Sequence, residues 1–100
     1  MKNFRTYLLA VNFYKQTKCH KLPRNLRDQL DRAASSIAAN LAEGYGRDSR
    51  ADQKRFYSIA MGSLRECQAI LQLSENEGSQ AWKTLDTLAA HLVKLIRCYG

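Results

Sequence analysis

The 100-residue sequence lacks the features of a disulfide framework, a metal centre or a membrane anchor. Its three cysteines, Cys19, Cys67 and Cys98, show no CxxC spacing, which argues against paired disulfides and against a zinc site. Three reduced thiols are typical of a cytoplasmic protein, and we expect no metal or other cofactor. No apolar stretch approaches the ~20 residues that span a bilayer, and the first residues lack the uncharged apolar run of a signal peptide. We therefore expect no membrane association.

Proline and strand-like patterns are also scarce. The only proline is Pro23, and no segment alternates apolar and polar residues as a half-buried strand does. The five glycines, of which all but Gly62 fall where a helix is expected to end, are Gly44, Gly46, Gly62, Gly78 and Gly100. With 45% hydrophobic and 25% charged residues, the composition is that of a folded chain. These absences favour an all-α fold in one domain over residues 1–100.

Apolar residues spaced by three and four predict two helices in the first half of the chain. The first, over residues 3–18, would bury Phe4, Tyr7, Leu8, Val11 and Tyr14. The second would start at Pro23, whose fixed φ suits a first helical position, and would end at Gly44 in a left-handed cap. Its apolar stripe is Leu26, Leu30, Ala33, Ile37 and Leu41.

The residue pattern in the second half of the sequence predicts two more helices. Ser49 offers an N-cap with Asp52 three residues later; this helix would end at Gly78 and bury Phe56, Ile59, Ala60, Ser63, Cys67, Ile70 and Leu71. Ser79 caps the last helix, which would bury Trp82, Leu85, Ala89, Leu92, Val93 and Ile96. Short connections make neighbouring helices antiparallel, so we predict an up-down-up-down four-helix bundle.

Polar residues flank the apolar stripes of the second and third helices, and we predict that they form a structural polar seam. These residues are Gln29, Arg32, Asn40 and Glu43 on one helix and Arg55 and Glu66 on the other. If residues whose numbers sum to ~95 lie at one level, Arg32 approaches Glu66, Glu43 approaches Arg55, and Gly62 marks the closest crossing. Such pairs fix register more reliably than they add stability. The alternative is two solvated faces. Neither arrangement makes a nucleophile–base constellation, so we predict no catalytic residue and no enzyme.

Two linked segments carry a resemblance to a known family. QLDRAASSIAANLAEGYGR (29–47) and RFYSIAMGSLRE (55–66) resemble the bacterial four-helix-bundle family named for the intervening sequences of large-subunit ribosomal RNA genes. The family pattern is approximately Q-x-x-R-A-x-x-S-I-x-x-N-I-A-E-G, then R-F-x-x-I-A-x-G-S-x-x-E. Leu41 replaces the usual isoleucine, and the other positions match.

The same family includes the accessory variability determinants of diversity-generating retroelements. Those are similar bundles that assemble as pentameric barrels, bind nucleic acid and associate with a reverse transcriptase. For this chain the resemblance implies the bundle fold and favours a ring-shaped homo-oligomer, with five copies, and nucleic acid as a partner. It leaves two roles open: an accessory to a reverse transcriptase in a retroelement, or a protein of an intervening sequence.

Apolar residues beyond the predicted core faces also favour an oligomer. They are Leu9 and Phe13 on the first helix, Tyr57, Met61 and Leu64 on the third, and Leu88, Leu95 and Tyr99 on the fourth. The alternative is a thick core with chance exposure.

The charge indicates where a partner would bind. The net charge of +7 favours anionic partners, and an antiparallel bundle gathers the first helix's start, the second connection and the last helix's end. We predict a nucleic-acid-binding surface there, made of Lys2, Arg5, Arg47, Arg50, Lys54, Lys94 and Arg97. Binding would depend strongly on salt and little on sequence. The function predicted is a non-enzymatic nucleic-acid-binding scaffold; the alternative is a module that binds an acidic protein without nucleic acid.

Overall fold

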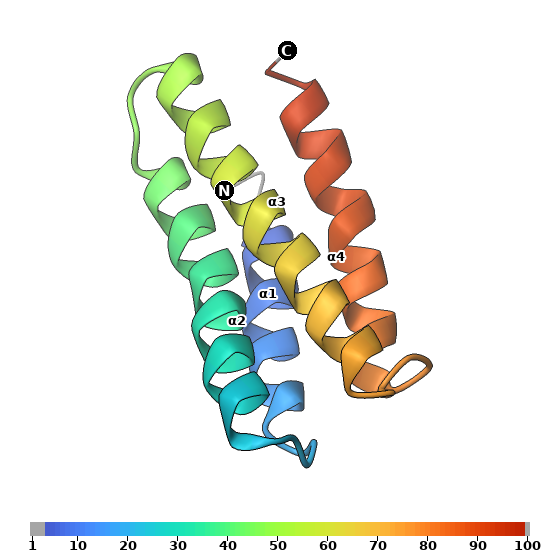
Figure 1. Cartoon of the computed structure of the whole chain (residues 1–100). Helices are drawn as coiled ribbons and strands as arrows, with labels where there is room; N and C mark the ends of the chain where they lie inside the picture. The colour runs from blue at the N-terminus through green and yellow to red at the C-terminus, as the bar shows by residue number, and fades with distance from the viewer. Residues whose placement is uncertain (1–3, 100) are drawn as a thin grey trace.

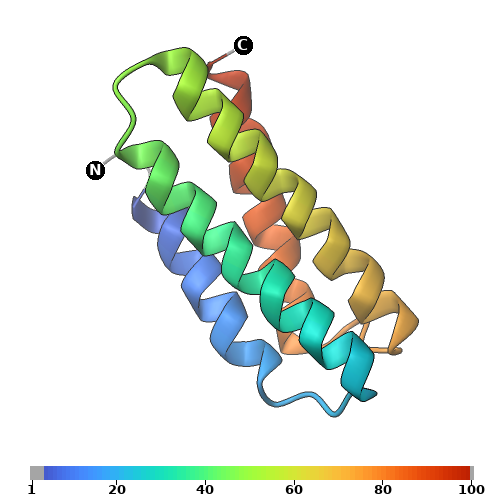
Figure 2. The ribbon, with the colours of Figure 1, turned by 60° about the vertical axis from the view of Figure 1, so that its left-hand side comes forward.

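The computed structural model describes residues 4–99, which form four α-helices connected by short loops. The helices are α1 (Phe4–Thr17), α2 (Arg24–Tyr45), α3 (Arg50–Leu73) and α4 (Gln80–Arg97). They run alternately up and down (Figures 1 and 2), and each helix packs on two neighbours, α1 and α3 lying diagonally opposite one another. The bundle measures 40 × 21 × 19 Å. The predicted antiparallel four-helix bundle is confirmed.

Both predicted serine caps are formed. The Ser49 hydroxyl accepts a hydrogen bond from the Asp52 N–H at 3.1 Å, and the Ser79 hydroxyl accepts one from the Trp82 N–H at 3.2 Å. Each satisfies one of the amide groups that a helix start leaves without an intrahelical partner. Pro23 lies just outside α2, in the N-cap position. The helix starts could therefore be predicted to within a residue or two.

The prediction that α2 ends at Gly44 in a left-handed cap is wrong. The helix continues to Tyr45, and Gly46 follows it with a right-handed φ of −85°. Gly44 is buried because α3 passes over it: a Cβ there would lie 2.6 Å from Tyr57 Cε1 and 3.3 Å from Phe56 Cβ. Glycine is therefore needed at this position for helix packing. At Gly62, where we predicted the closest crossing, a Cβ would meet nothing within 4 Å.

The end of α3 also differs from the prediction. The helix stops at Leu73, five residues before Gly78, in a Schellman motif. The Asn76 N–H donates to the Leu71 carbonyl at 2.7 Å and the Glu75 N–H to the Gln72 carbonyl at 3.1 Å. Glu75 takes the left-handed position that glycine usually fills, with φ of +59°. Gly78, at φ of +85°, turns the chain toward α4.

The core face of α2 is the predicted one, since Leu30, Ala33, Ile37 and Leu41 are buried. On α1 the predicted face is wrong. Phe4 and Leu8 remain 46% and 48% exposed, and the buried residues are Thr6, Ala10, Phe13 and Thr17. The small side chains of Thr6, Ala10 and Thr17 let neighbouring helices approach. The Thr17 hydroxyl donates a hydrogen bond to the Tyr14 carbonyl at 2.6 Å.

The other two helices are also rotated relative to their predicted orientation. On α3, Tyr57 and Leu64 are fully buried, although we had placed them outside the core, whereas Ile59 is 42% exposed. On α4, Leu88 and Leu95 are buried, while Val93 is only half-buried. Part of each predicted face is nevertheless correct, because Ala60, Cys67, Ile70 and Leu71 on α3 and Leu85 and Leu92 on α4 are buried as predicted. None of the helices in residues 4–99 is long and apolar enough to cross a membrane.

Candidate nucleic-acid interface

The seam between α2 and α3 is built from small polar groups. The Ser63 hydroxyl donates to the Ser36 hydroxyl at 2.9 Å, and the Asn40 side-chain amide donates to the Ser36 hydroxyl at 3.0 Å and its carbonyl at 2.8 Å. Together with the close approach at Gly44, this network sets the level at which the two helices pack. The paired residues have numbers that sum to 99–101, slightly more than predicted.

The predicted ion pairs across this seam do not form among the described residues. Glu43 instead pairs with Arg47 at 3.5 Å, and Arg55 with Asp52 at 3.8 Å, each within one turn of its partner. Arg32, Gln29 and Glu66 are exposed. The rotation of α3 explains the difference, because it turns Arg55 and Glu66 away from α2. Of the six predicted seam residues, only Asn40 takes part in a hydrogen bond that connects to α3.

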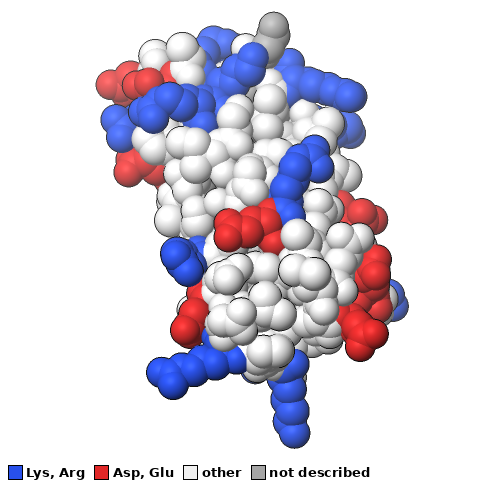
Figure 3. All heavy atoms as spheres, in the orientation of Figure 1, with Lys and Arg blue, Asp and Glu red and all other residues white. Residues whose placement is uncertain are grey.

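The predicted basic residues, in contrast, gather at one end of the bundle. Arg47, Arg50 and Lys54 come from the α2–α3 loop and the start of α3, and Lys94 and Arg97 from the last turns of α4. Arg5 is exposed in the first turn of α1, and Lys2 lies outside the described residues. Figure 3 shows Lys and Arg concentrated at this end. We call it the basic end.

Three arginines at the basic end lie over aromatic rings. The guanidinium carbon of Arg47 is 4.7 Å from the centroid of the Phe56 ring, and that of Arg55 is 4.4 Å from the same centroid. Arg50 lies 4.6 Å from the Tyr99 centroid and donates to the Cys98 carbonyl at 2.6 Å. A ring face attracts and orients a cation without neutralising its charge. The rings therefore position all three guanidinium groups. Arg47 and Arg55 are also paired with carboxylates, whereas Arg50 forms no ion pair within residues 4–99.

Aromatic rings form a continuous row behind these arginines. Successive ring centroids are 6.1 Å apart for Phe4–Tyr7, 6.4 Å for Tyr7–Tyr45, 5.9 Å for Tyr45–Tyr57 and 5.5 Å for Tyr57–Tyr99. The row runs from α1 through α2 and α3 to Tyr99, just after α4. Burial raises the pKa of Tyr45 far above its ordinary value. The sequence analysis placed Phe4 and Tyr7 on one core face and Tyr57 and Tyr99 beyond the core, and it did not single out Tyr45. Their grouping could have been found from the fact that all lie at the same end of the antiparallel bundle.

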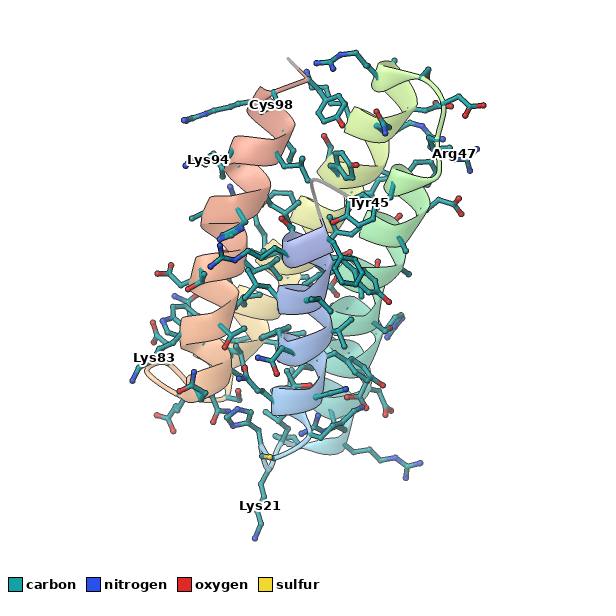
Figure 4. The ribbon with its side chains drawn as sticks, turned by 180° about the vertical axis from the view of Figure 1, so that it is seen from behind. Lys21, Tyr45, Arg47, Lys83, Lys94 and Cys98 are labelled. Atoms are coloured by element: carbon teal, nitrogen blue, oxygen red, sulfur yellow. The ribbon has the colours of Figure 1, made fainter. Side chains whose placement is uncertain are left out.

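Two surface hollows lie at or near the basic end, one on each side of α1. The hollow between α1 and α4, about 660 Å³, is lined by Thr6, Ala90, His91, Val93, Lys94, Leu95, Arg97 and Cys98. The hollow between α1 and α2, about 330 Å³, is lined by Phe4, Tyr7, Ala42, Tyr45 and Gly46. Figure 4 shows Lys94 on α4, and Cys98 just after it, at the same end as Tyr45 and Arg47.

At the opposite end, two cations share one carboxylate. Lys18 Nζ and Arg27 Nη1 both lie 3.1 Å from the same Asp31 oxygen, and Arg27 also donates to the His20 carbonyl. Desolvation raises the pKa of Asp31, but the hydrogen bonds and charges of Lys18 and Arg27 together outweigh it and leave the pKa lowered. Lys21 extends from this end (Figure 4).

The described residues supply no recognisable centre for metal binding. Residues 4–99 contain no group of three or more His, Cys, Asp or Glu side chains placed to share a metal ion. Cys19 and Cys98 are exposed, whereas Cys67 is buried, and its burial raises the thiol pKa to about 12. A thiol with such a pKa is protonated and unreactive at neutral pH.

Comparison with known proteins agrees with the residue pattern. No curated relative matches the chain significantly. The model of one protein family, described as the 23S rRNA-intervening sequence protein family, matches residues 4–99, which include all four helices. The match covers nearly the whole chain and includes both the α2–α3 seam and the basic end, so this chain belongs to the 23S rRNA-intervening sequence protein family.

Proposed function

We propose that this chain is a non-enzymatic, nucleic-acid-binding scaffold that contacts a phosphate backbone through its basic end. The observation that carries the proposal is the group of cations at this end that form no ion pair within residues 4–99: Arg50, held over the Tyr99 ring, with Lys54, Lys94 and Arg97. The family's description, which refers to 23S rRNA, favours RNA as the ligand. Phosphate contacts of this kind supply affinity with little sequence preference.

A matched pair of triple variants tests the proposal. Lys54→Gln, Lys94→Gln and Arg97→Gln together remove three positive charges from the basic end; Lys21→Gln, Arg24→Gln and Lys83→Gln remove three elsewhere. Binding of a single-stranded RNA is measured by fluorescence anisotropy over a range of salt concentrations. We expect the first variant to lower the salt dependence by roughly two units of log K per log salt and the second to change it little. Equal effects of the two variants would contradict the proposal.

The scaffold is an oligomer in this proposal, with a ring of five copies favoured by the family resemblance. Support comes from exposed apolar residues on two opposite sides of the bundle: Leu8 on α1, and Ile59 and Leu73 on α3, are 48%, 42% and 72% exposed. A contact between two different patches is heterologous, and such contacts form a ring when the rotation between successive copies closes. Light scattering coupled to size exclusion tests the assembly. Ile59→Glu should release single copies, and a wild-type monomer would contradict it.

The hollow between α1 and α4 favours a second candidate function, which is docking of an acidic protein segment. It combines the cationic Lys94 and Arg97 with the apolar Val93 and Leu95, as a surface for an acidic amphipathic helix would. In this version the partner is a protein, and the resemblance to accessory variability determinants points to a reverse transcriptase. A preparation without nucleic acid that retains a specific acidic protein would favour this candidate.

A further inference from the structure

The hollow between α1 and α2 at the basic end has walls of aromatic rings. It is lined by Phe4, Tyr7, Ala42, Tyr45 and Gly46, and we call it the aromatic pocket. Phe4 and Tyr7 stack with an interplanar angle of 28°, and Tyr7 meets Tyr45 edge-on at 68°. Its volume of about 330 Å³ is at the small end of the range for ligand pockets.

The pocket is open because α2 carries small residues where it faces the first turn of α1. Ala42 and Gly46 are exposed and leave space beside the rings. Phe4, at 46% exposure, presents part of its ring to solvent, whereas Tyr45 is half-buried and forms part of the floor. Figure 4 shows Tyr45 between α1 and the Arg47 end of α2. Aromatic surface is thus accessible beside the cationic groups.

The charges around the aromatic pocket favour an anionic ligand with a planar apolar part. None of its lining residues is acidic, and Arg5 and Arg47 directly follow the lining residues Phe4 and Gly46. The nearest acidic residue along α2, Glu43, is paired with Arg47 at 3.5 Å. A nucleotide combines a flat ring that stacks on aromatic side chains with a phosphate that arginine attracts.

We infer that the aromatic pocket takes an unpaired nucleobase, so that the protein prefers single-stranded or looped nucleic acid over a duplex. The inference rests on the proposed function and names the form of its ligand. Bases inside a duplex are stacked on their neighbours and cannot enter a side-chain pocket, whereas single strands and loops can splay them out. Phosphate contacts at the basic end then supply affinity, and the pocket supplies the preference.

The test compares three ligands of equal length: an oligouridylate, the same strand with every base removed, and a duplex. Phe4→Ala removes one wall of the pocket, and Ala42→Leu fills it while keeping every ring. We expect each variant to lose about tenfold in affinity for the oligouridylate and little for the abasic strand or the duplex. Asn12→Ala is the control, because Asn12 is exposed on α1, lines neither hollow and is not among the apolar residues proposed to join copies of the chain.

The possible outcomes separate the inference from the proposed function. If the wild-type protein binds the abasic strand or the duplex as tightly as the oligouridylate, the pocket inference is overturned while the scaffold function stands. Failure to bind any of the three ligands would overturn both. If Phe4→Ala lowers the oligomer size seen by light scattering and loses affinity equally for all three ligands, the pocket is a contact between copies of the chain, and the inference is likewise overturned.

Discussion

The two ends of the bundle carry similar side chains in different surroundings. At the end formed by the α1–α2 loop, Lys18 and Arg27 share the Asp31 carboxylate. At the basic end, Arg50 lies over the Tyr99 ring, and Arg47 has Phe56 as well as Glu43 as a neighbour. A carboxylate neutralises a cation, whereas a ring only orients it. The comparison teaches that the charge available to a partner depends on what each cation contacts.

The largest expected effect comes from breaking the packing beneath the basic end. Gly44→Ala would place a methyl group 2.6 Å from Cε1 of the fully buried Tyr57, which belongs to the aromatic row. We expect a loss of about 2 kcal/mol in the free energy of unfolding, measured by urea denaturation. Gly62→Ala is the control: its Cβ would meet nothing within 4 Å, and alanine in a helix interior should add up to about 1 kcal/mol. Similar losses in both variants would contradict this account of the crossing.

A second variant removes the carboxylate that neutralises two cations at the end of the bundle formed by the α1–α2 loop. Asp31→Asn leaves Lys18 and Arg27 without their shared carboxylate, and we expect a loss of about 1 kcal/mol at pH 7. Because the folded-state pKa of Asp31 is lowered, its contribution is complete above the unfolded pKa of ~4 and disappears as the pH falls through the folded value. The unfolding free energies of wild type and variant should therefore converge in acid.

The control for this prediction is Asp28→Asn, which makes the same change of charge on α2 at a residue that forms no ion pair with residues 4–99. A gap between wild type and Asp31→Asn that stays constant from pH 7 to acid would refute the ion-pair explanation. Asp31→Asn should also strengthen weak nucleic-acid binding at this end, because Lys18 and Arg27 lose their carboxylate partner.

A smaller effect is expected when the cation–π contact between Arg50 and Tyr99 is removed. Arg50→Gln removes the contact with Tyr99 and the hydrogen bond to the Cys98 carbonyl, which together contribute about 0.5–1 kcal/mol at an exposed site. Thermal unfolding measures this loss, and RNA anisotropy should show weaker binding. Arg50→Lys separates the two roles: it keeps the charge but not the planar stacking group. Full retention of affinity in both variants would remove Arg50 from the interface.

The smallest expected effect is a gain in stability at the opposite end. Glu75 holds a left-handed conformation with φ of +59° at the end of α3, which glycine adopts without steric cost. Glu75→Gly should raise the free energy of unfolding by about 0.5 kcal/mol. Glu77→Gly, which changes the same charge in the same loop, serves as the control in a thermal melt. No difference between them would mean that the Schellman motif tolerates glutamate.

The number of helices and their starts could be predicted from the sequence because local signals determine them, whereas the C-terminal ends of α2 and α3 could not. Ser49 and Ser79 cap helices in the expected way, and α2 has a single apolar stripe, so its buried face was identified correctly. The basic end followed from topology alone, since its residues lie near helix ends whatever the helices' rotation.

The rotation of α1, α3 and α4 could not be predicted in the same way. Each of these helices has apolar residues over a wide arc, so several faces could serve as the core. Packing against neighbours decides between them: Tyr57 enters the space above Gly44 in place of the adjacent Phe56. The predicted seam of ion pairs failed for this reason, because side chains such as Glu66 reach a partner helix only in one rotation.

Two of the three cysteines are exposed, one at each end of the bundle, so dyes attached to them would report how the bundle is oriented in an assembly. Cys98 follows α4 at the basic end, Cys19 lies in the α1–α2 loop at the other end, and both are exposed. Cys67 is buried with a pKa of about 12, so maleimide dyes should leave it unmodified in the folded protein. In a closed ring every Cys98 faces one rim and every Cys19 the other. Energy transfer between dyes on different copies would then distinguish a ring with all basic ends on one side from a stack in which they alternate.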